Sequence, residues 1–305
     1  MSMFSEWSKR QKVILIDGSM AVGLEEQGLD LNHRLWTAKA IIEAPHKIQA
    51  VHEAYFNAGA NITITASYQA SMKGFLELGY SEAESVHFLE NTVALAQAAR
   101  ESSESNQEKW IAGSIGPYGA YLADGSEYRG NYNVSRNFLK EFHEERLQVL
   151  VKAQVDLLAI ETIPDKTELL VLLELIKDFP EVPAWVSFTL KDEKHISDGT
   201  SLVEMQGLLE QQPQVLAYGI NCVAPNLVEP ALLTLKKQAK KPLVAYPNSG
   251  AIYNPVSKVW TETTHVHDVF TNQAKNWYAH GCTWVGGCCC TSSTEIGLLR
   301  ETFPE

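Results

Sequence analysis

The feature that most constrains the fold of this chain is the alternation of short apolar runs with longer segments of helical period. Eight runs rich in Val, Ile and Ala recur along the sequence, at 13–17, 61–66, 110–116, 155–162, 184–190, 215–221, 242–248 and 282–287. Several are apolar at nearly every position, which is typical of strands buried on both faces of a parallel sheet. Strict alternation of apolar and polar residues, which would indicate a β-sandwich, is not their pattern.

Helical segments lie between most of these runs. The clearest begins at Asp165, an N-cap residue followed three positions later by a carboxylate and then by leucines that recur on one face. Ser81 and Glu84 have the spacing of a capping box, and Ser135 precedes a third helical stretch. Eight such strand–helix units predict an α/β fold, a (β/α)8 TIM barrel that occupies residues 1–305 as a single domain. A doubly wound open sheet is the main alternative.

Charge and cysteine content exclude several classes of partner. The formal net charge is -12 and the acidic residues are scattered, which argues against nucleic acid or an anionic membrane as a partner. No segment has the 18 apolar residues expected of a membrane-spanning helix. The five cysteines are an odd number and three are contiguous, a pattern that fits reduced thiols in a cytoplasmic protein better than disulfides.

Catalytic groups in a parallel barrel come from the carboxyl ends of its strands. The residues that end or follow the apolar runs are unusually polar in this chain, and they include Asp17, Gly18, Ser19, Ser67, Tyr68, Gln69, Ser114, Glu161, Thr162, Asn221, Cys222, Asn248, Ser249, Cys288 and Cys289. The longest segment without a regular pattern, 116–132, follows the third run and is dense in Gly and Tyr. Loops of this length tend to be functional, so we expect it on the face of the barrel that carries the active site.

Two of the eight runs lead into cysteine. Strands six and eight of a barrel lie one strand apart, so Cys222, Cys288 and Cys289 are placed to converge at its mouth. Three sulfurs are most of a tetrahedral zinc site, and a fourth position left open is characteristic of a catalytic ion. A zinc ion with thiolate ligands is suited to binding a substrate thiol, which indicates alkyl transfer to sulfur.

Simpler structural interpretations compete with these functional ones. Cys282 lies inside the eighth run and is expected to be a small buried hydrophobe. Glu161 alternatively caps the helix that follows it, and Asp17 alternatively serves a turn with Gly18. Consecutive cysteines are alternatively accidental or redox-active, and it is the presence of Cys222 that favours a metal site.

Seven motifs, taken together, resemble the homocysteine S-methyltransferase family. They run in that family's order from 15 to 289 and read LIDGSMAVGLEEQG, AGANITITASYQAS, GSIGPYGAYLADGSEYRG, AIETIP, YGINC, VAYPNSG and VGGCC. The joint occurrence of GINC and GGCC is the most specific part of the resemblance. The loop 116–132 is most similar to the branch that uses S-methylmethionine or S-adenosylmethionine as methyl donor, rather than to the betaine or cobalamin branches.

The resemblance implies a zinc-dependent enzyme of methionine biosynthesis that moves a methyl group from a sulfonium donor to the thiol of L-homocysteine. It implies one Zn2+ per chain, held by the three cysteines of GINC and GGCC. Asp17 and Glu161 match acidic positions that hold the homocysteine ammonium group in relatives. Gly18 and Ser19 are then expected near the polar end of the amino acid, and Asn221 and Asn248 in the wall of the site or behind it.

A cationic donor also needs partners of its own. Aromatic and acidic side chains of the second and third strand ends supply candidates, namely Tyr68, Tyr118, Tyr121, Glu127 and Tyr128. Two positions depart from the family: relatives commonly have arginine where this chain has Cys290, and often glutamate where it has Ala251. Three other readings remain open, namely a selenocysteine or other small-thiol methyltransferase, a corrinoid or folate methyltransferase barrel, and a zinc-binding barrel without catalytic activity.

Overall fold

The computed structural model describes residues 2–31, 37–250, 253–254, 259–260 and 266–304. Eight parallel strands form one sheet, and they are β1 (Ile14–Leu15), β2 (Ile62–Ile64), β3 (Trp110–Ile115), β4 (Leu157–Ile163), β5 (Ala184–Phe188), β8 (Val215–Asn221), β9 (Leu243–Tyr246) and β12 (Cys282–Val285). Their order is β1-β12-β9-β8-β5-β4-β3-β2, and a parallel bridge from Ile16 to Ile62 joins the two ends. The predicted (β/α)8 barrel is confirmed, because an open sheet would leave those two edges apart.

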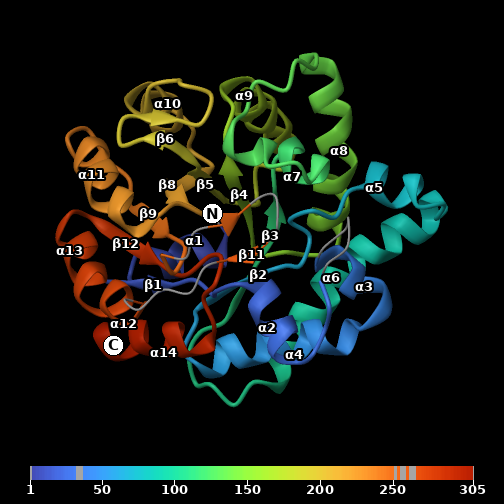
Figure 1. Cartoon of the computed structure of the whole chain (residues 1–305), viewed down its shortest axis with the longest axis horizontal. Coiled ribbons are helices and arrows are strands. Elements are labelled where there is room, and N and C mark those ends of the chain that lie inside the picture. Colours follow the sequence, from blue (N-terminus) through green and yellow to red (C-terminus); the bar gives the residue numbers. More distant parts are fainter. Residues whose placement is uncertain (1, 32–36, 251–252, 255–258, 261–265, 305) are drawn as a thin grey trace.

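Helices surround the strands, as Figure 1 shows. The helices that follow the eight strands are α4 (Pro45–Asn57), α6 (Glu82–Ser102), α8 (Arg136–Lys152), α9 (Lys166–Leu175), α10 (Leu202–Glu210), α11 (Pro225–Lys236), α13 (Ala274–Ala279) and α14 (Ser293–Thr302). The remaining helical pieces are α1 (Met3–Ser8), α2 (Met20–Glu26), α3 (Thr37–Glu43), α5 (Met72–Glu77), α7 (Tyr118–Leu122), α12 (Val266–Asp268), η1 (Ser126–Tyr128), η2 (Ile176–Asp178) and η3 (Val269–Gln273). None of the helices within the described ranges is both long and apolar enough to cross a membrane.

The predicted helix starts are confirmed, with one difference in how a side chain is used. Ser81 and Glu84 form a complete capping box, and Ser135 accepts a hydrogen bond from the backbone N–H of Phe138. Asp165 caps α9 by accepting from two backbone N–H groups. The carboxylate three positions later, Glu168, does not return to the cap and instead accepts the N–H of Tyr118 at 2.6 Å.

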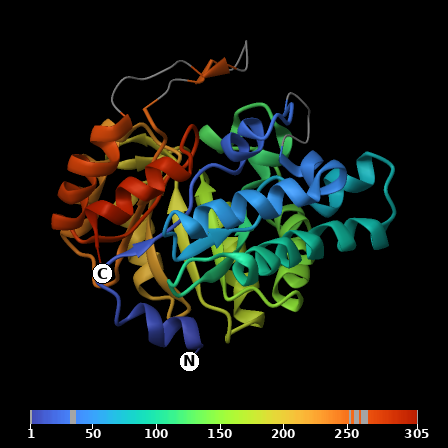
Figure 2. The ribbon, with the colours of Figure 1, turned by 90° about the horizontal axis from the view of Figure 1, so that it is seen from below.

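The amino end of the barrel is closed by α1. Phe4 and Trp7 are buried there, and their rings contact Trp110, with Phe4 also 5.6 Å from the ring of Trp284. Figure 2 shows this dark blue helix on the side of the molecule opposite the short hairpin of β10 (Tyr253–Asn254) and β11 (Val259–Trp260). The barrel is therefore open only at the carboxyl ends of its strands, and the candidate catalytic residues lie at that end.

Several strand-end connections carry extra structure, including those after β5 and β3. After β5 the chain forms a hairpin of β6 (Leu190–Asp192) and β7 (His195–Ile196). After β3, the segment 116–132 is not wholly irregular as the sequence predicted, because it contains α7 and η1. It does lie at the carboxyl end of a barrel strand, as expected.

Candidate active site

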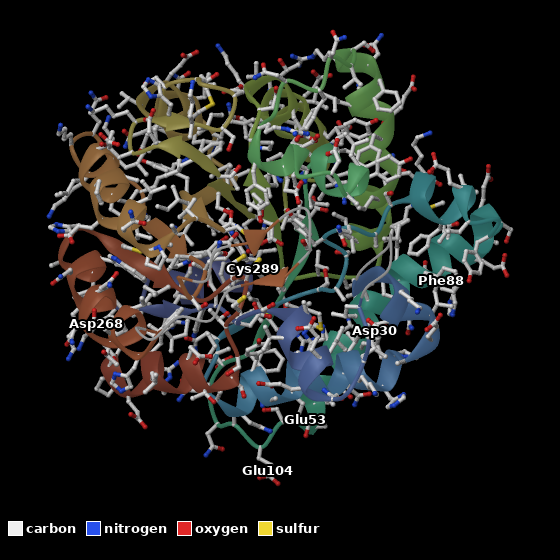
Figure 3. All side chains as sticks on the ribbon, in the orientation of Figure 1. Asp30, Glu53, Phe88, Glu104, Asp268 and Cys289 are labelled. Carbon is white, nitrogen blue, oxygen red and sulfur yellow. The ribbon has the colours of Figure 1, made fainter. Side chains whose placement is uncertain are left out.

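Three sulfur atoms meet at the carboxyl ends of β8 and β12. The Sγ atoms of Cys222, Cys288 and Cys289 all lie within 4.8 Å of one another, and Cys222 and Cys289 are 3.4 Å apart. Figure 3 shows Cys289 near the middle of the molecule when the barrel is viewed as in Figure 1. The predicted convergence of cysteines from strands six and eight is therefore what the structure shows.

Backbone geometry explains why two glycines precede the cysteine pair. A Cβ on Gly287 would lie 2.4 Å from Oγ1 of Thr291, and one on Gly286 would lie 2.8 Å from Cβ of Ile16. The N–H of Gly287 also donates to the carbonyl oxygen of Asp17 at 3.0 Å. Only glycine permits this close approach of β12 to β1, which sets the position of the cysteines that follow.

The three thiols share their protons unequally. Hydrogen bonds from Cys288 and Cys289 hold the pKa of the Cys222 thiol well below its usual range. The same bonds raise the pKa of Cys288 and of Cys289, because a second thiolate beside the first is unfavourable. A metal cation removes that penalty, and sulfur ligands of this number and spacing suit a thiophilic ion such as Zn2+.

Asp17 follows β1 and is almost fully buried, with 2% of its surface exposed. Its Oδ2 accepts hydrogen bonds from Thr63 Oγ1 and the Ile64 backbone N–H, each at 2.8 Å. Its Oδ1 is buried and has no hydrogen-bond partner among the described residues. Burial raises the pKa of Asp17 to about 8. A buried carboxylate with one oxygen unsatisfied is a characteristic of a ligand site rather than of a turn.

Glu161 lies on β4 with its carboxylate inside the barrel mouth. Oε1 accepts from Ser114 Oγ at 2.5 Å, and Oε2 accepts from Tyr246 Oη at 3.2 Å. Burial raises the pKa of Glu161 to about 7, and its charge also adds to the raised pKa of Asp17. Because Asp165 provides the cap of α9, the alternative of Glu161 as a helix cap is not what the structure shows.

Asn221 contacts the strand that carries Glu161. Its amide accepts from the Thr162 N–H and donates to Thr162 Oγ1, both at 2.8 Å. Thr162 has a left-handed φ of 62°, which is uncommon for a β-branched residue and needs such support. Asn221 has 0% exposure, and both ends of its amide are bonded to Thr162, the residue after Glu161.

Of the other predicted residues, Asn248 has a buried atom without a partner in the described residues, whereas Ser19 and Gly18 have structural contacts. Asn248 follows β9, and its buried Oδ1 has no hydrogen-bond partner in the described part of the chain. Ser19 caps α2 through Val22, and Gly18 has no room for a side chain because Tyr55 and Thr291 approach it. These two contribute backbone shape beside Asp17.

The tyrosines predicted to bind the donor lie in two different environments. The Tyr128 hydroxyl is 3.2 Å from Cys222 Sγ, and either atom could be the donor. The pKa of Tyr68 is raised mainly by burial and also by the charges of Glu127 and Cys222, so Tyr68 too lies near the sulfur cluster. Tyr118 and Tyr121 instead pack against Phe142 of α8, and Tyr121 Oη donates to Glu77. Those two tyrosines are therefore part of the packing between the loop and the outer helices.

The two remaining cysteines lie apart from the cluster. Cys282 has 0% exposure within β12 and its thiol donates to the carbonyl oxygen of Trp284, which confirms the prediction of a buried hydrophobe. Cys290 has a left-handed φ of 59° and does not belong to the group of three. Burial raises the pKa of the Cys290 thiol to about 11. Ala251, the other departure from the family, lies outside the described residues.

The sequence singled out Ser114, which donates to Glu161, but not the other polar groups that hold the two carboxylates. Thr63 fixes Asp17, and Tyr246 joins Glu161 to Ser187 and Trp185 through its hydroxyl. The sequence signal that could have found them is a hydroxyl side chain inside an otherwise apolar strand. A buried hydroxyl group needs a hydrogen-bond partner, so its presence in a core indicates a polar contact.

Comparison with known proteins agrees with this geometry. The homocysteine S-methyltransferase family model matches residues 14–303. Homocysteine S-methyltransferase YbgG from Bacillus subtilis is 44% identical over 291 residues, which cover 93% of this chain and 92% of that protein. A selenocysteine methyltransferase from Astragalus bisulcatus is 39% identical over 306 residues, which cover 93% and 90% of the two chains.

A solved structure gives the same result for the fold. The metallated form of the homocysteine methyltransferase MmuM from Escherichia coli has a TM-score of 0.87 and 40% sequence identity, covering 98% of this chain and 99% of that one. Its description as metallated agrees with a metal site formed by Cys222, Cys288 and Cys289 here. The chain therefore belongs to the homocysteine S-methyltransferase family, enzymes that transfer a methyl group to homocysteine.

Proposed function

We propose that this enzyme transfers a methyl group from a sulfonium donor, S-methylmethionine or S-adenosylmethionine, to L-homocysteine and forms methionine, with one Zn2+ held by Cys222, Cys288 and Cys289. The observation that carries the proposal is the group of three sulfurs within 4.8 Å at the mouth of the barrel. When bound there, zinc supplies a positive charge that keeps a substrate thiol deprotonated near neutral pH. The thiolate is the nucleophile that methyl transfer requires.

Two carboxylates are suited to hold the amino group of homocysteine. Asp17 has a buried oxygen without a partner in the described residues, and the pKa values of Asp17 and Glu161 are raised mainly by burial. A bound ammonium group supplies the missing positive charge and favours the ionised form of both acids. Thr63 and Ser114 fix the orientation of the carboxylates, so the substrate is positioned by groups that are already in place.

The barrel contributes position rather than acid–base chemistry at carbon. The electron pair of the homocysteine sulfur forms the new bond to the methyl carbon, and the pair of the broken bond stays on the donor sulfur. Attacking sulfur, carbon and leaving sulfur must lie in line, so most of the rate enhancement is expected from placing two substrates at one mouth. The ligand thiols must stay reduced for metal binding, which supports our proposal of a cytoplasmic location.

A second acceptor has a specific observation in its favour. The relative from Astragalus bisulcatus is named as a selenocysteine methyltransferase at 39% identity. Homocysteine and selenocysteine share the amino acid group that Asp17 and Glu161 would hold, so these two residues do not discriminate between them. Homocysteine remains the proposed acceptor because the family model and the relative from Bacillus subtilis carry that name.

The test is methionine formation from homocysteine with each sulfonium donor in turn. Metal content is quantified for the wild type and for Cys288→Ala, and selenocysteine is supplied as a competing acceptor. We expect turnover with at least one donor, one zinc per chain, and loss of both together in the variant. Turnover that persists in protein freed of all metal would refute the zinc assignment.

A further inference from the structure

We infer that the carboxylate of Glu127, together with Tyr68 and Tyr128, forms the subsite for the positively charged sulfur of the methyl donor. This inference rests on the proposed function, since it assigns the second substrate of the same reaction. It concerns the segment that follows β3, where the sequence alone offered five candidates without ranking them.

The backbone of Glu127 is fixed on both sides. Its carbonyl oxygen accepts a hydrogen bond from Thr189 Oγ1 at 2.8 Å. Its N–H faces Gly119 so closely that a Cβ on that glycine would lie 2.5 Å from the Glu127 nitrogen. The backbone of Glu127 is therefore held by the packing of η1 against α7 and the end of β5.

The carboxylate itself has an unsatisfied atom. Oε2 of Glu127 is buried and has no hydrogen-bond partner within the described residues. The neighbouring cation, Arg129, is largely exposed and makes its side-chain hydrogen bonds to Asp124 and Ser126. A buried carboxylate without a paired cation is unfavourable, and such groups are enriched where a charged ligand binds.

Glu127 lies near Cys222, one of the three proposed metal ligands. The Tyr128 hydroxyl is 3.2 Å from Cys222 Sγ. Burial raises the pKa of Tyr68, and the charges of Glu127 and Cys222 raise it further. One acid and two aromatic rings thus lie next to the proposed metal ligands. A sulfonium carries positive charge but has no hydrogen to donate, so it is recognised by nearby negative charge and aromatic rings rather than by hydrogen bonds.

This arrangement has a kinetic consequence. The positive charge of the donor decreases as its carbon–sulfur bond breaks, and the product is a neutral thioether. Glu127 therefore stabilises the bound donor more than the transition state and releases the neutral product. Loss of the charge should raise the KM of the donor while kcat stays unchanged or increases.

The experiment compares S-methylmethionine with L-homoleucine, in which a neutral carbon replaces the charged sulfur and the amino acid part is identical. Binding of each is measured by calorimetry on metal-loaded protein, for the wild type and for the isosteric variant Glu127→Gln. We expect the wild type to prefer the sulfonium by about tenfold or more and the variant to show less than about a twofold preference. The same measurement with S-adenosylmethionine and S-adenosylhomocysteine covers the other donor.

Glu77→Gln is the matched control, because Glu77 accepts a hydrogen bond from Tyr121 on the outer side of the same segment. Glu127→Asp keeps the charge and should retain most of the preference. An equal preference in Glu127→Gln and the wild type would overturn the subsite, as would a wild type that binds both ligands equally. Binding and turnover separate the two proposals: turnover with an unchanged donor KM in Glu127→Gln refutes only the subsite, whereas a charge preference without turnover refutes only the proposed function.

Discussion

Asp17→Asn should change activity and stability in opposite directions. The asparagine has the same shape, and its Oδ1 can accept the hydrogen bonds that Thr63 and the Ile64 N–H donate now. Its amide group then occupies the position of the carboxylate oxygen that lacks a partner in the described residues. An ammonium group placed there would meet a donor instead of an anion.

The expected size of the loss follows from the burial of the site. Removing one member of a buried charged pair costs about 3–5 kcal/mol. Glu161 still faces the same ammonium group, so we take the lower value, about 3 kcal/mol, which corresponds to roughly a hundredfold fall in kcat/KM for homocysteine. The KM of the donor should stay unchanged, because the proposed donor subsite of Glu127, Tyr68 and Tyr128 does not include Asp17.

The free energy of unfolding of Asp17→Asn should change in the direction opposite to its activity. Burial raises the pKa of Asp17 to about 8, from an ordinary value of 3.8. Between these values the folded protein retains a proton that the unfolded chain has released, so the wild type loses stability as pH rises, by up to about 1.4 kcal/mol per pH unit. The asparagine has no such proton. The free energy of unfolding of the variant, relative to that of the wild type, should therefore be higher at pH 8 than at pH 6.

The assay is urea unfolding of both proteins at pH 6 and pH 8, alongside homocysteine kinetics. Asp156→Asn is the control: Asp156 also accepts a strand N–H, that of Ile111, but it pairs with Arg100 at the amino end of β4. That variant should lose stability and keep its KM. If Asp17→Asn instead lost stability at both pH values and kept its homocysteine KM, the carboxylate would be a structural group and the reasoning would be wrong.

Four further outcomes are expected. Tyr128→Phe removes the hydroxyl 3.2 Å from Cys222 Sγ and should weaken metal binding about tenfold in a chelator competition, whereas unchanged affinity would show that this contact does not tune the site. Gly287→Ala should lower metal stoichiometry, since its Cβ would collide with Thr291 Oγ1, and a full complement of metal would contradict the packing argument. Phe4→Ala should cost about 3–5 kcal/mol in urea unfolding with homocysteine KM preserved, because it opens the far end of the barrel. Metal removal by a chelator should abolish turnover while far-UV circular dichroism keeps its helical signal; loss of that signal would mean that the metal is needed for folding.

The barrel could be predicted because its signals are local. A strand buried on both faces is apolar at successive positions, and a capped helix begins with a polar residue at a fixed spacing. Cys222 and the cysteine pair after β12 were also predictable, because the barrel's order fixes which strand ends are near each other. Asp17 and Glu161 were visible as acids on apolar strand ends, although their contacts were not.

Side-chain partners distant in sequence could not be predicted. Asp165 and Glu168 have the spacing of a cap and its return contact, yet Glu168 binds the N–H of Tyr118 and the ring of His143 instead. That choice depends on α8 and α7, which no local pattern connects to α9. The direction of each tyrosine in the segment 116–132 was hidden for the same reason, since a Tyr that packs outward and one that reaches a thiol have the same sequence signal.

The pairing of the first strand, β1, with the last, β12, determines when the site can form during synthesis. Asp17 follows the first strand, the cysteine pair follows the last one, and the two strands pair with each other through Ile14–Trp284 and Leu15–Val285. A ribosome must therefore release nearly the whole chain before the third sulfur can join the other groups. Metal uptake by the three-sulfur site should accordingly be one of the last events of biogenesis, and a nascent chain that ends before β12 has no complete site to load.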